Sequence, residues 1–159
     1  MGATPPDGET PKERADRELI ELLNELRVVL PGVTVLLAFL LAVPFANGWT
    51  RITSFQRDVF VVAFLSTAVS VALLTAPSSY HRLRFRHGDK ERIVRVGNRL
   101  TIAGIVASAV SLEAVVLLVM DVVVSRGAAI SAAAGLFAVV ASLWYGLPFL
   151  AALRDRSAR

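Results

Sequence analysis

Residues 100–120 read LTIAGIVASAVSLEAVVLLVM, an apolar run whose only charged residue is Glu113. At about 1.5 Å of rise per residue, a helix of this length crosses the roughly 30 Å hydrocarbon core of a bilayer. Buried helices of water-soluble domains seldom stay uncharged over such a length. Three further runs of the same kind lie at 28–46, 59–76 and 128–153. We therefore predict a polytopic membrane protein with four transmembrane helices.

The composition of the whole chain agrees with this prediction. Its 159 residues are 55% hydrophobic, which is more apolar mass than one small water-soluble core buries. Backbone groups of a lipid-exposed strand or loop stay unsatisfied, so apolar runs without alternation should be helices rather than barrel strands. The expected fold class is all-α, a four-helix bundle over residues 28–153. The chain has no cysteine, which excludes disulfides, thiolate metal ligands and cysteine nucleophiles.

The basic residues predict the orientation in the membrane. Of the 17 Lys and Arg, only Arg51, Arg57 and Arg126 lie on the connections of one side. By the positive-inside rule the opposite side is cytoplasmic, and both termini are expected there. No basic surface with interleaved aromatic residues suggests a nucleic-acid partner. We expect the cytoplasmic basic residues to contact anionic lipid, and they are Lys12, Arg14, Arg17, Arg27, Arg82, Arg84, Arg86, Lys90, Arg92, Arg95, Arg99, Arg154, Arg156 and Arg159.

The segments outside the spans are predicted to form two tails and a surface helix. Residues 1–9 are expected to form a disordered tail, and residues 154–159 a cytoplasmic tail. Leucines at helical spacing opposite glutamates predict an amphipathic helix over 10–30 on the cytoplasmic membrane surface. The alternative is that 10–30 is only a polar lead-in to the first span.

Two prolines are expected to set the boundaries of these segments. Pro31 is expected to bend the chain into the first span, because proline has no backbone N–H and disfavours helix at the preceding residue. Pro77 is expected to end the second span. A basic cytoplasmic loop is predicted over 77–99, in which Asp89 begins a helix that continues into the third span.

Glu113 is the most specific chemical signal in the sequence. An ionised carboxylate at the centre of a span costs about 2.5–3.5 kcal/mol on insertion scales, so this side chain is expected to be protonated, paired or facing a wet cavity. It is therefore a candidate site for reversible binding of a proton or cation. The alternatives are a protonated Glu113 that donates to a neighbouring hydroxyl as a packing contact, and a contact within an oligomer. The candidate supporting hydroxyls, chosen by matching depth, are Ser66, Thr67, Ser70 and Ser142.

Asp121 lies two helical turns beyond Glu113, near the predicted outer interface. We expect it to be solvated or paired with Arg126. If Glu113 lines a pathway, Asp121 is the acid placed to form its outer mouth. A cytoplasmic mouth, or a surface that binds lipid, is expected at Glu25, Arg27, His81, Arg82, Arg84 and Arg86.

No catalytic or cofactor-binding pattern is present in the sequence. The chain lacks a nucleophile elbow, a phosphate-binding glycine loop, a metal-spaced cluster and an intramembrane histidine pair of the kind that holds haem. The two histidines lie among arginines, which repel cations. We therefore predict that the protein is not an enzyme and has no cofactor or metal site.

Several short motifs resemble a known family. These are Glu25 to Gly32 (ELRVVLPG), Pro44 with Phe45, Gln56 with Arg57, Ala76 with Pro77, and His81 with Arg82. Together they resemble small, uncharacterised four-span membrane proteins of actinobacteria, and the resemblance covers most of the chain. Some members are labelled automatically as sodium:proton antiporters. The resemblance implies the plasma membrane of a bacterium and makes ion transport a hypothesis to test.

Two functional hypotheses follow. The first is a homo-oligomeric transporter or channel for protons or monovalent cations, in which Glu113 titrates. An oligomer is expected because known antiporter folds assemble inverted repeats and broken helices around their sites, which four continuous spans and one central acid do not provide. The alternative is an accessory membrane protein that transports nothing and binds anionic lipid or a cytoplasmic partner through its basic loop and amphipathic helix.

Overall fold

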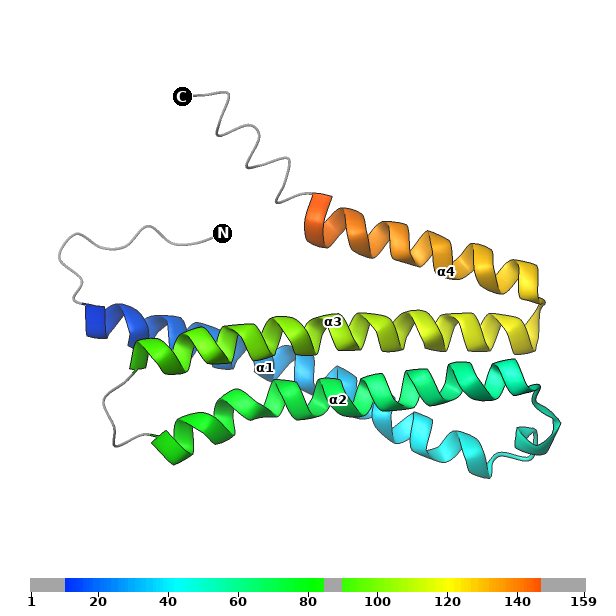
Figure 1. Ribbon diagram of the computed structural model, residues 1–159, viewed down its shortest axis with the longest axis horizontal. Coiled ribbons are helices and arrows are strands. Elements are labelled where there is room, and N and C mark those ends of the chain that lie inside the picture. The colour runs from blue at the N-terminus through cyan, green and yellow to red at the C-terminus, as the bar shows by residue number, and fades with distance from the viewer. Residues whose placement is uncertain (1–10, 85–89, 147–159) are drawn as a thin grey trace, which may run out of the picture. The chain divides into compact units, whose positions relative to one another are not determined.

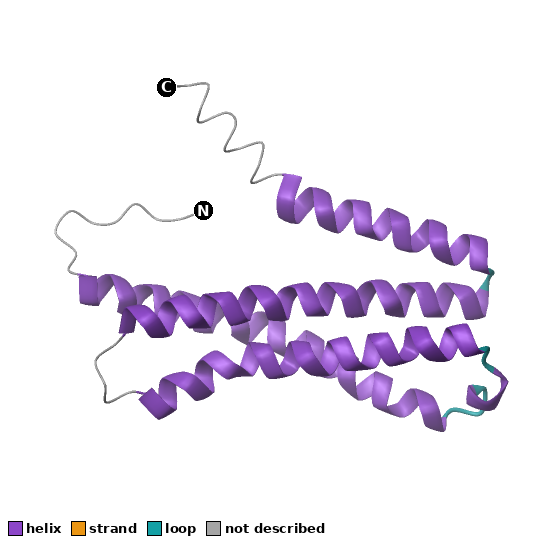
Figure 2. Ribbon diagram, viewed as in Figure 1, coloured by secondary structure: helices purple, strands orange, loops and turns teal. Residues whose placement is uncertain are grey.

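The computed structural model describes residues 11–84 and 90–146, and all regular structure in these ranges is helical (Figures 1 and 2). Four of its helices are long and apolar enough to cross a membrane, which confirms the predicted all-helical class. The two predicted tails, 1–9 and 154–159, lie outside the described residues. The long helices are α1 (Pro11–Ala42), α2 (Ser54–Arg84), α3 (Lys90–Val123) and α4 (Arg126–Ala141), and the short helical turns are η1 (Val43–Phe45), η2 (Trp49–Arg51) and η3 (Ser142–Gly146).

The helix α1 contains both the predicted amphipathic helix and the first apolar run, without an interruption at Pro31. Proline removes one backbone donor, which leaves the carbonyl of Arg27 without its usual helical partner. Pro31 is nevertheless accommodated, and nearby the hydroxyl of Thr34 donates to the carbonyl of Leu30 at 2.8 Å. The first apolar segment, Ile20–Phe45, covers most of α1 and extends into η1, so it begins within the predicted surface helix.

The helix α2 also continues through its proline. Residues 77–84 of the predicted loop are helix, 85–89 lie outside the described residues, and 90–99 form the start of α3, where a helix continuing into the third span was predicted. Pro77 is fully buried, and a Cβ built on Gly97 of α3 would lie 3.5 Å from the Pro77 Cβ. Pro77 therefore packs against α3 at a glycine, which has no side chain.

The chain divides into two compact units, and the first comprises Met1–Pro44 and Ser66–Ser108. Its apolar core contains Leu22, Leu26, Val33 and Leu74. The Ser70 hydroxyl donates to the Gly104 carbonyl at 2.7 Å, which joins α2 to α3. A Cβ added to Gly104 would lie only 2.8 Å from the Leu74 side chain, so a glycine is needed for this close approach.

The second unit comprises Phe45–Leu65 and Ala109–Arg159. The Ser111 hydroxyl of α3 donates to the Ala63 carbonyl of α2 at 3.0 Å, and both residues are fully buried. An edge-to-face contact joins the rings of Trp49 and Phe60, whose centroids are 4.7 Å apart. The helix α4 leaves α3 at a tight turn, where the Ser125 hydroxyl caps α4 by accepting from the Ala128 N–H at 3.3 Å.

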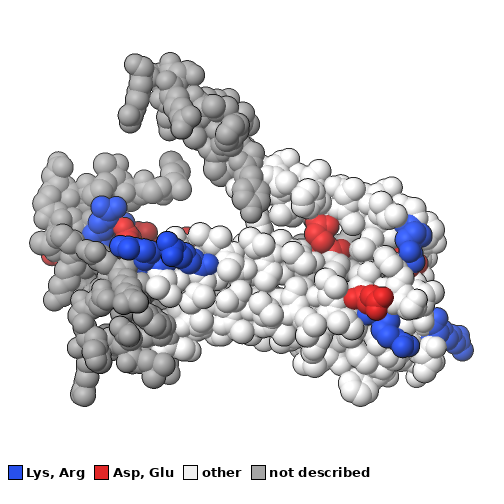
Figure 3. All heavy atoms as spheres, in the orientation of Figure 1, with Lys and Arg blue, Asp and Glu red and all other residues white. Residues whose placement is uncertain are grey.

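Large apolar side chains are widely exposed on the described helices. Val28 is 79% exposed, Phe39 is 70% exposed and Phe137 is 65% exposed. Most of the described surface in Figure 3 is neither acidic nor basic. A surface of this kind fits hydrocarbon as the surrounding solvent, because monomeric soluble proteins rarely expose large contiguous apolar patches.

Candidate functional site

Glu113 lies on α3 in the second unit, two residues beyond the buried Ser111. Its Oε1 atom is buried and has no hydrogen-bond partner within residues 11–84 and 90–146. A buried polar atom without a partner costs about 1–3 kcal/mol, and more when the group is charged. The Oε1 atom of Glu113 is therefore a buried acceptor that no donor among the described residues satisfies.

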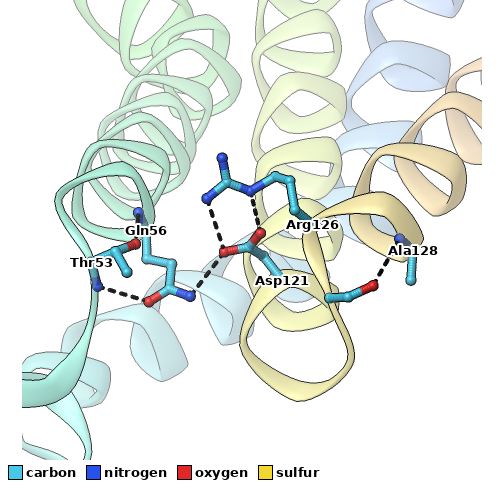
Figure 4. Close-up of polar contacts among 6 residues, drawn as sticks. Thr53, Gln56, Asp121, Arg126 and Ala128 are labelled. Carbon is cyan, nitrogen blue, oxygen red and sulfur yellow. Dashed lines mark hydrogen bonds and ion pairs between the residues drawn. The ribbon is translucent and has the colours of Figure 1, made fainter.

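Asp121 lies on the same helix and unit but in very different surroundings. Its side chain is 4% exposed and forms an ion pair between Oδ1 and Arg126 Nε. Arg126 Nη2 also donates to Oδ2 at 3.5 Å, and Gln56 Nε2 donates to the same oxygen at 2.8 Å. Figure 4 shows these three donors converging on the carboxylate. Asp121 was expected to be either solvated or paired with Arg126, and the structure shows the pairing.

The local sequence at the start of α2 explains how Gln56 is held. Thr53 and Gln56 form a reciprocal capping box, a Thr followed three residues later by Gln. The Thr53 N–H donates to Gln56 Oε1 at 2.9 Å, and the Gln56 N–H donates to Thr53 Oγ1 at 3.2 Å. With its oxygen engaged by Thr53, the amide presents its NH₂ group to Asp121 (Figure 4).

Arg126 contacts the aromatic ring of Phe55 as well as the carboxylate of Asp121. Its guanidinium carbon lies 3.6 Å from the centroid of the Phe55 ring, a cation–π contact. We call Thr53, Phe55, Gln56, Asp121 and Arg126 the Asp121 cluster. Sequence reasoning identified the arginine pairing but missed Gln56, although the T-x-x-Q spacing before an apolar run was the signal that places its amide at a helix start.

Three of the four candidate supporting hydroxyls have interacting partners in the structure. Ser70 donates to the Gly104 carbonyl, and Ser66 and Thr67 also have interacting partners. Ser142 is exposed at the start of η3. The predicted support of Glu113 by these hydroxyls stays a prediction.

The predicted cytoplasmic group is described only in part. Glu25 and Arg27 are exposed on α1, and Arg27 lines an open cavity of about 490 Å³ in the first unit. His81, Arg82 and Arg84 belong to the last turn of α2, but their side chains lie outside the described structure, as does the whole of Arg86. In the part of the chain that is described, no three His, Asp or Glu side chains gather as metal ligands would.

Comparison with known proteins gives one match. A family model described as "Family of unknown function (DUF6328)" matches residues 8–148. No curated protein and no solved structure matches the chain. The comparisons therefore contribute no activity, ligand or partner.

Proposed function

The chain belongs to this family of unknown function, DUF6328, and from its own side chains we propose that it binds and passes protons or small monovalent cations through Glu113. The four apolar helices are compatible with a membrane protein. The observation that supports the proposal is the Glu113 carboxyl, which has a buried oxygen without a partner in the described structure and lies in a span otherwise rich in apolar residues. Ionisable residues inside membranes are expensive to place there and commonly mark ion or proton pathways.

The proposal includes an arrangement in the membrane. We expect the four helices to form a bundle in the plasma membrane of a bacterium, with both termini and the basic connections on the cytoplasmic side. Each chain has a single central acid, so we expect a homo-oligomer that brings two or more copies of Glu113 to a shared pathway. The resemblance to actinobacterial proteins labelled as antiporters is in keeping with this type of activity.

The test is a flux measurement on the full chain in liposomes that contain a pH-sensitive dye. Glu113→Gln keeps the size of the side chain but removes the titrating group, so the rate of dissipation of an imposed pH gradient should fall by about tenfold or more. Asp58→Asn is the matched control, because Asp58 is an exposed acid at the start of another apolar helix. Its rate should equal that of the wild type.

Folding is checked by size-exclusion chromatography and helicity in detergent. An equal rate in wild type and Glu113→Gln liposomes would contradict the proposal. Replacing Na⁺ by K⁺ in the same assay shows whether a metal cation exchanges for the proton.

The second candidate is an accessory membrane protein that binds anionic lipid or a cytoplasmic partner and carries no flux. The open cavity beside Arg27 favours it, since that cavity combines a cationic side chain with apolar walls. Absence of flux in the wild type, with unchanged behaviour of Glu113→Gln, would support this candidate over the first.

A further inference from the structure

An open cavity of about 490 Å³ lies in the first unit, far along the sequence from Glu113. This volume falls within the roughly 300–1,000 Å³ typical of small-molecule sites. Its walls come from α1 and α2 and divide into two kinds of surface. The apolar part is formed by Leu23, Leu26, Leu30 and Leu74, and the polar part by Arg27, Thr75, Ser78 and Ser79.

The polar part can receive an anion. Arg27 is exposed and has no ion pair with any residue in the described ranges. Glu25 is two residues away, a spacing that puts the two side chains on different sides of the helix. A guanidinium without a carboxylate partner is well suited to a phosphate, which it binds through paired N–H donors.

The hydroxyls of the cavity differ in their availability. Thr75 donates to the Val71 carbonyl at 2.8 Å and Ser79 donates to the Thr75 carbonyl at 3.4 Å. Ser78 is exposed and makes no hydrogen bond with the described residues. Arg27 and Ser78 therefore provide the free donors of this site.

The apolar part is built for a hydrocarbon chain. Leu26 and Leu74 belong to the buried core, and Leu23 and Leu30 pack against that core from its edge. Leu26 and Leu74 are already covered by protein, so the accessible apolar wall is formed by Leu23 and Leu30. A free inorganic anion would leave this wall uncovered, whereas an amphiphile covers it with its tail while its phosphate binds the arginine.

The position of the cavity along the helices also fits a lipid. Ser78 and Ser79 are the last two residues of the apolar segment Ser54–Ser79, and Arg27 lies in the first third of Ile20–Phe45. The end of a membrane-crossing segment lies at the level of lipid headgroups, and a long arginine side chain reaches that level from within.

We propose that this cavity binds one anionic phospholipid, with the phosphate on Arg27 and Ser78 and an acyl chain against Leu23 and Leu30. The site does not depend on Glu113, so it stands or falls separately from the transport function; it rests on the second candidate function above and names its lipid class and its residues.

Native mass spectrometry of the full chain tests this proposal. The protein is extracted from vesicles containing equal amounts of phosphatidylcholine and phosphatidylglycerol, and the lipids that remain bound are counted. The wild type should retain one phosphatidylglycerol in preference to phosphatidylcholine. Arg27→Gln should lower this preference about tenfold, since one charge-assisted contact is lost, while Arg27→Lys keeps the charge and should lose less.

Arg57→Gln is the matched control, because Arg57 is an exposed arginine at the start of an apolar segment in the second unit. It should behave as the wild type does. An equal loss of lipid in both glutamine variants would overturn the proposal, because it would indicate a general charge effect. Arg27 is exposed, so Arg27→Gln should remain folded, which helicity in detergent verifies.

Competition separates a lipid from a free anion. Inorganic phosphate or glycerol phosphate should not displace the retained phosphatidylglycerol, and a short-chain phosphatidylglycerol should displace it poorly. Displacement by inorganic phosphate would overturn the assignment to a lipid, as would equal retention of phosphatidylcholine and phosphatidylglycerol.

Discussion

Two carboxylates on α3 are only eight residues apart, which is about 12 Å along the helix, yet their surroundings are opposite. Asp121 receives donors from Arg126 and Gln56, and these donors are held in turn by Phe55 and Thr53. The buried oxygen of Glu113 receives none from the described residues. A paired carboxylate is explained by the structure that it stabilises. A buried carboxyl oxygen without a donor has a cost that no contact among the described residues offsets, and this difference is why we propose binding at Glu113 and a structural role for Asp121.

The largest expected difference between the two positions is in stability. Asp121→Ala removes the acceptor of three donors and leaves the Arg126 guanidinium without its carboxylate. We expect the Tm in detergent to fall on the order of 5 °C or more, while Glu113→Gln leaves it unchanged or raises it slightly. Thermal unfolding followed by tryptophan fluorescence measures both. If Glu113→Gln proves the more destabilising change, the two roles are assigned the wrong way round.

A smaller effect is expected from Gln56→Ala. This change removes one donor to Asp121 together with half of the capping box, but it leaves the Arg126 ion pair in place. The Tm should fall by about half as much as in Asp121→Ala. In the Asp121→Ala background the same change should cost less, because the lost contact is already absent. Fully additive shifts in the double variant would show that Gln56 does not act through Asp121.

Ser111→Ala tests a contact between helices that lies two residues from Glu113 in the sequence. The Ser111 hydroxyl bonds to the Ala63 carbonyl between α3 and α2, and such bonds in membrane proteins average about 0.6 kcal/mol. We expect a fall in Tm of about 2 °C and a proton flux close to that of the wild type. Loss of flux with unchanged stability would mean that Ser111, and not only Glu113, takes part in the pathway.

The smallest effect is expected for an exposed pair. Arg14 and Glu18 are one turn apart on α1 and form a contact of 2.9 Å that is largely exposed to solvent. Glu18→Gln should change the Tm by no more than about 1 °C. A fall in Tm as large as that of Asp121→Ala would show that the burial of an ion pair does not decide how much its carboxylate contributes to stability.

The apolar runs were sufficient to predict the four long helices, because length and hydropathy depend on local sequence. The helix boundaries were not predictable in this way. Pro77 was expected to end the second span but lies inside α2, and Pro31, which was expected to bend the chain, lies inside α1. For Pro77 the reason is tertiary, since its ring is buried near Gly97 of another helix, a contact that no local pattern reveals.

The candidate site was predictable only to the level of single residues. Glu113 is conspicuous as a charge within an apolar run, and Arg126 is close to Asp121 in sequence. Gln56 reaches Asp121 from 65 residues away, so the contact depends on how the start of α2 lies against the end of α3 within the second unit. Arg27 and Ser78 likewise meet at one cavity only because α1 and α2 pack together in the first unit.

The central claim is that Glu113, and not Asp121, is the carboxyl available for binding within the membrane. The most direct measurement is labelling of the wild-type protein in lipid nanodiscs with a hydrophobic carbodiimide, which reacts with protonated carboxyls in apolar surroundings, followed by peptide mass spectrometry. We predict modification at Glu113, reduced by the transported cation, and none at Asp121. Labelling at Asp121 with Glu113 unmodified would contradict the account.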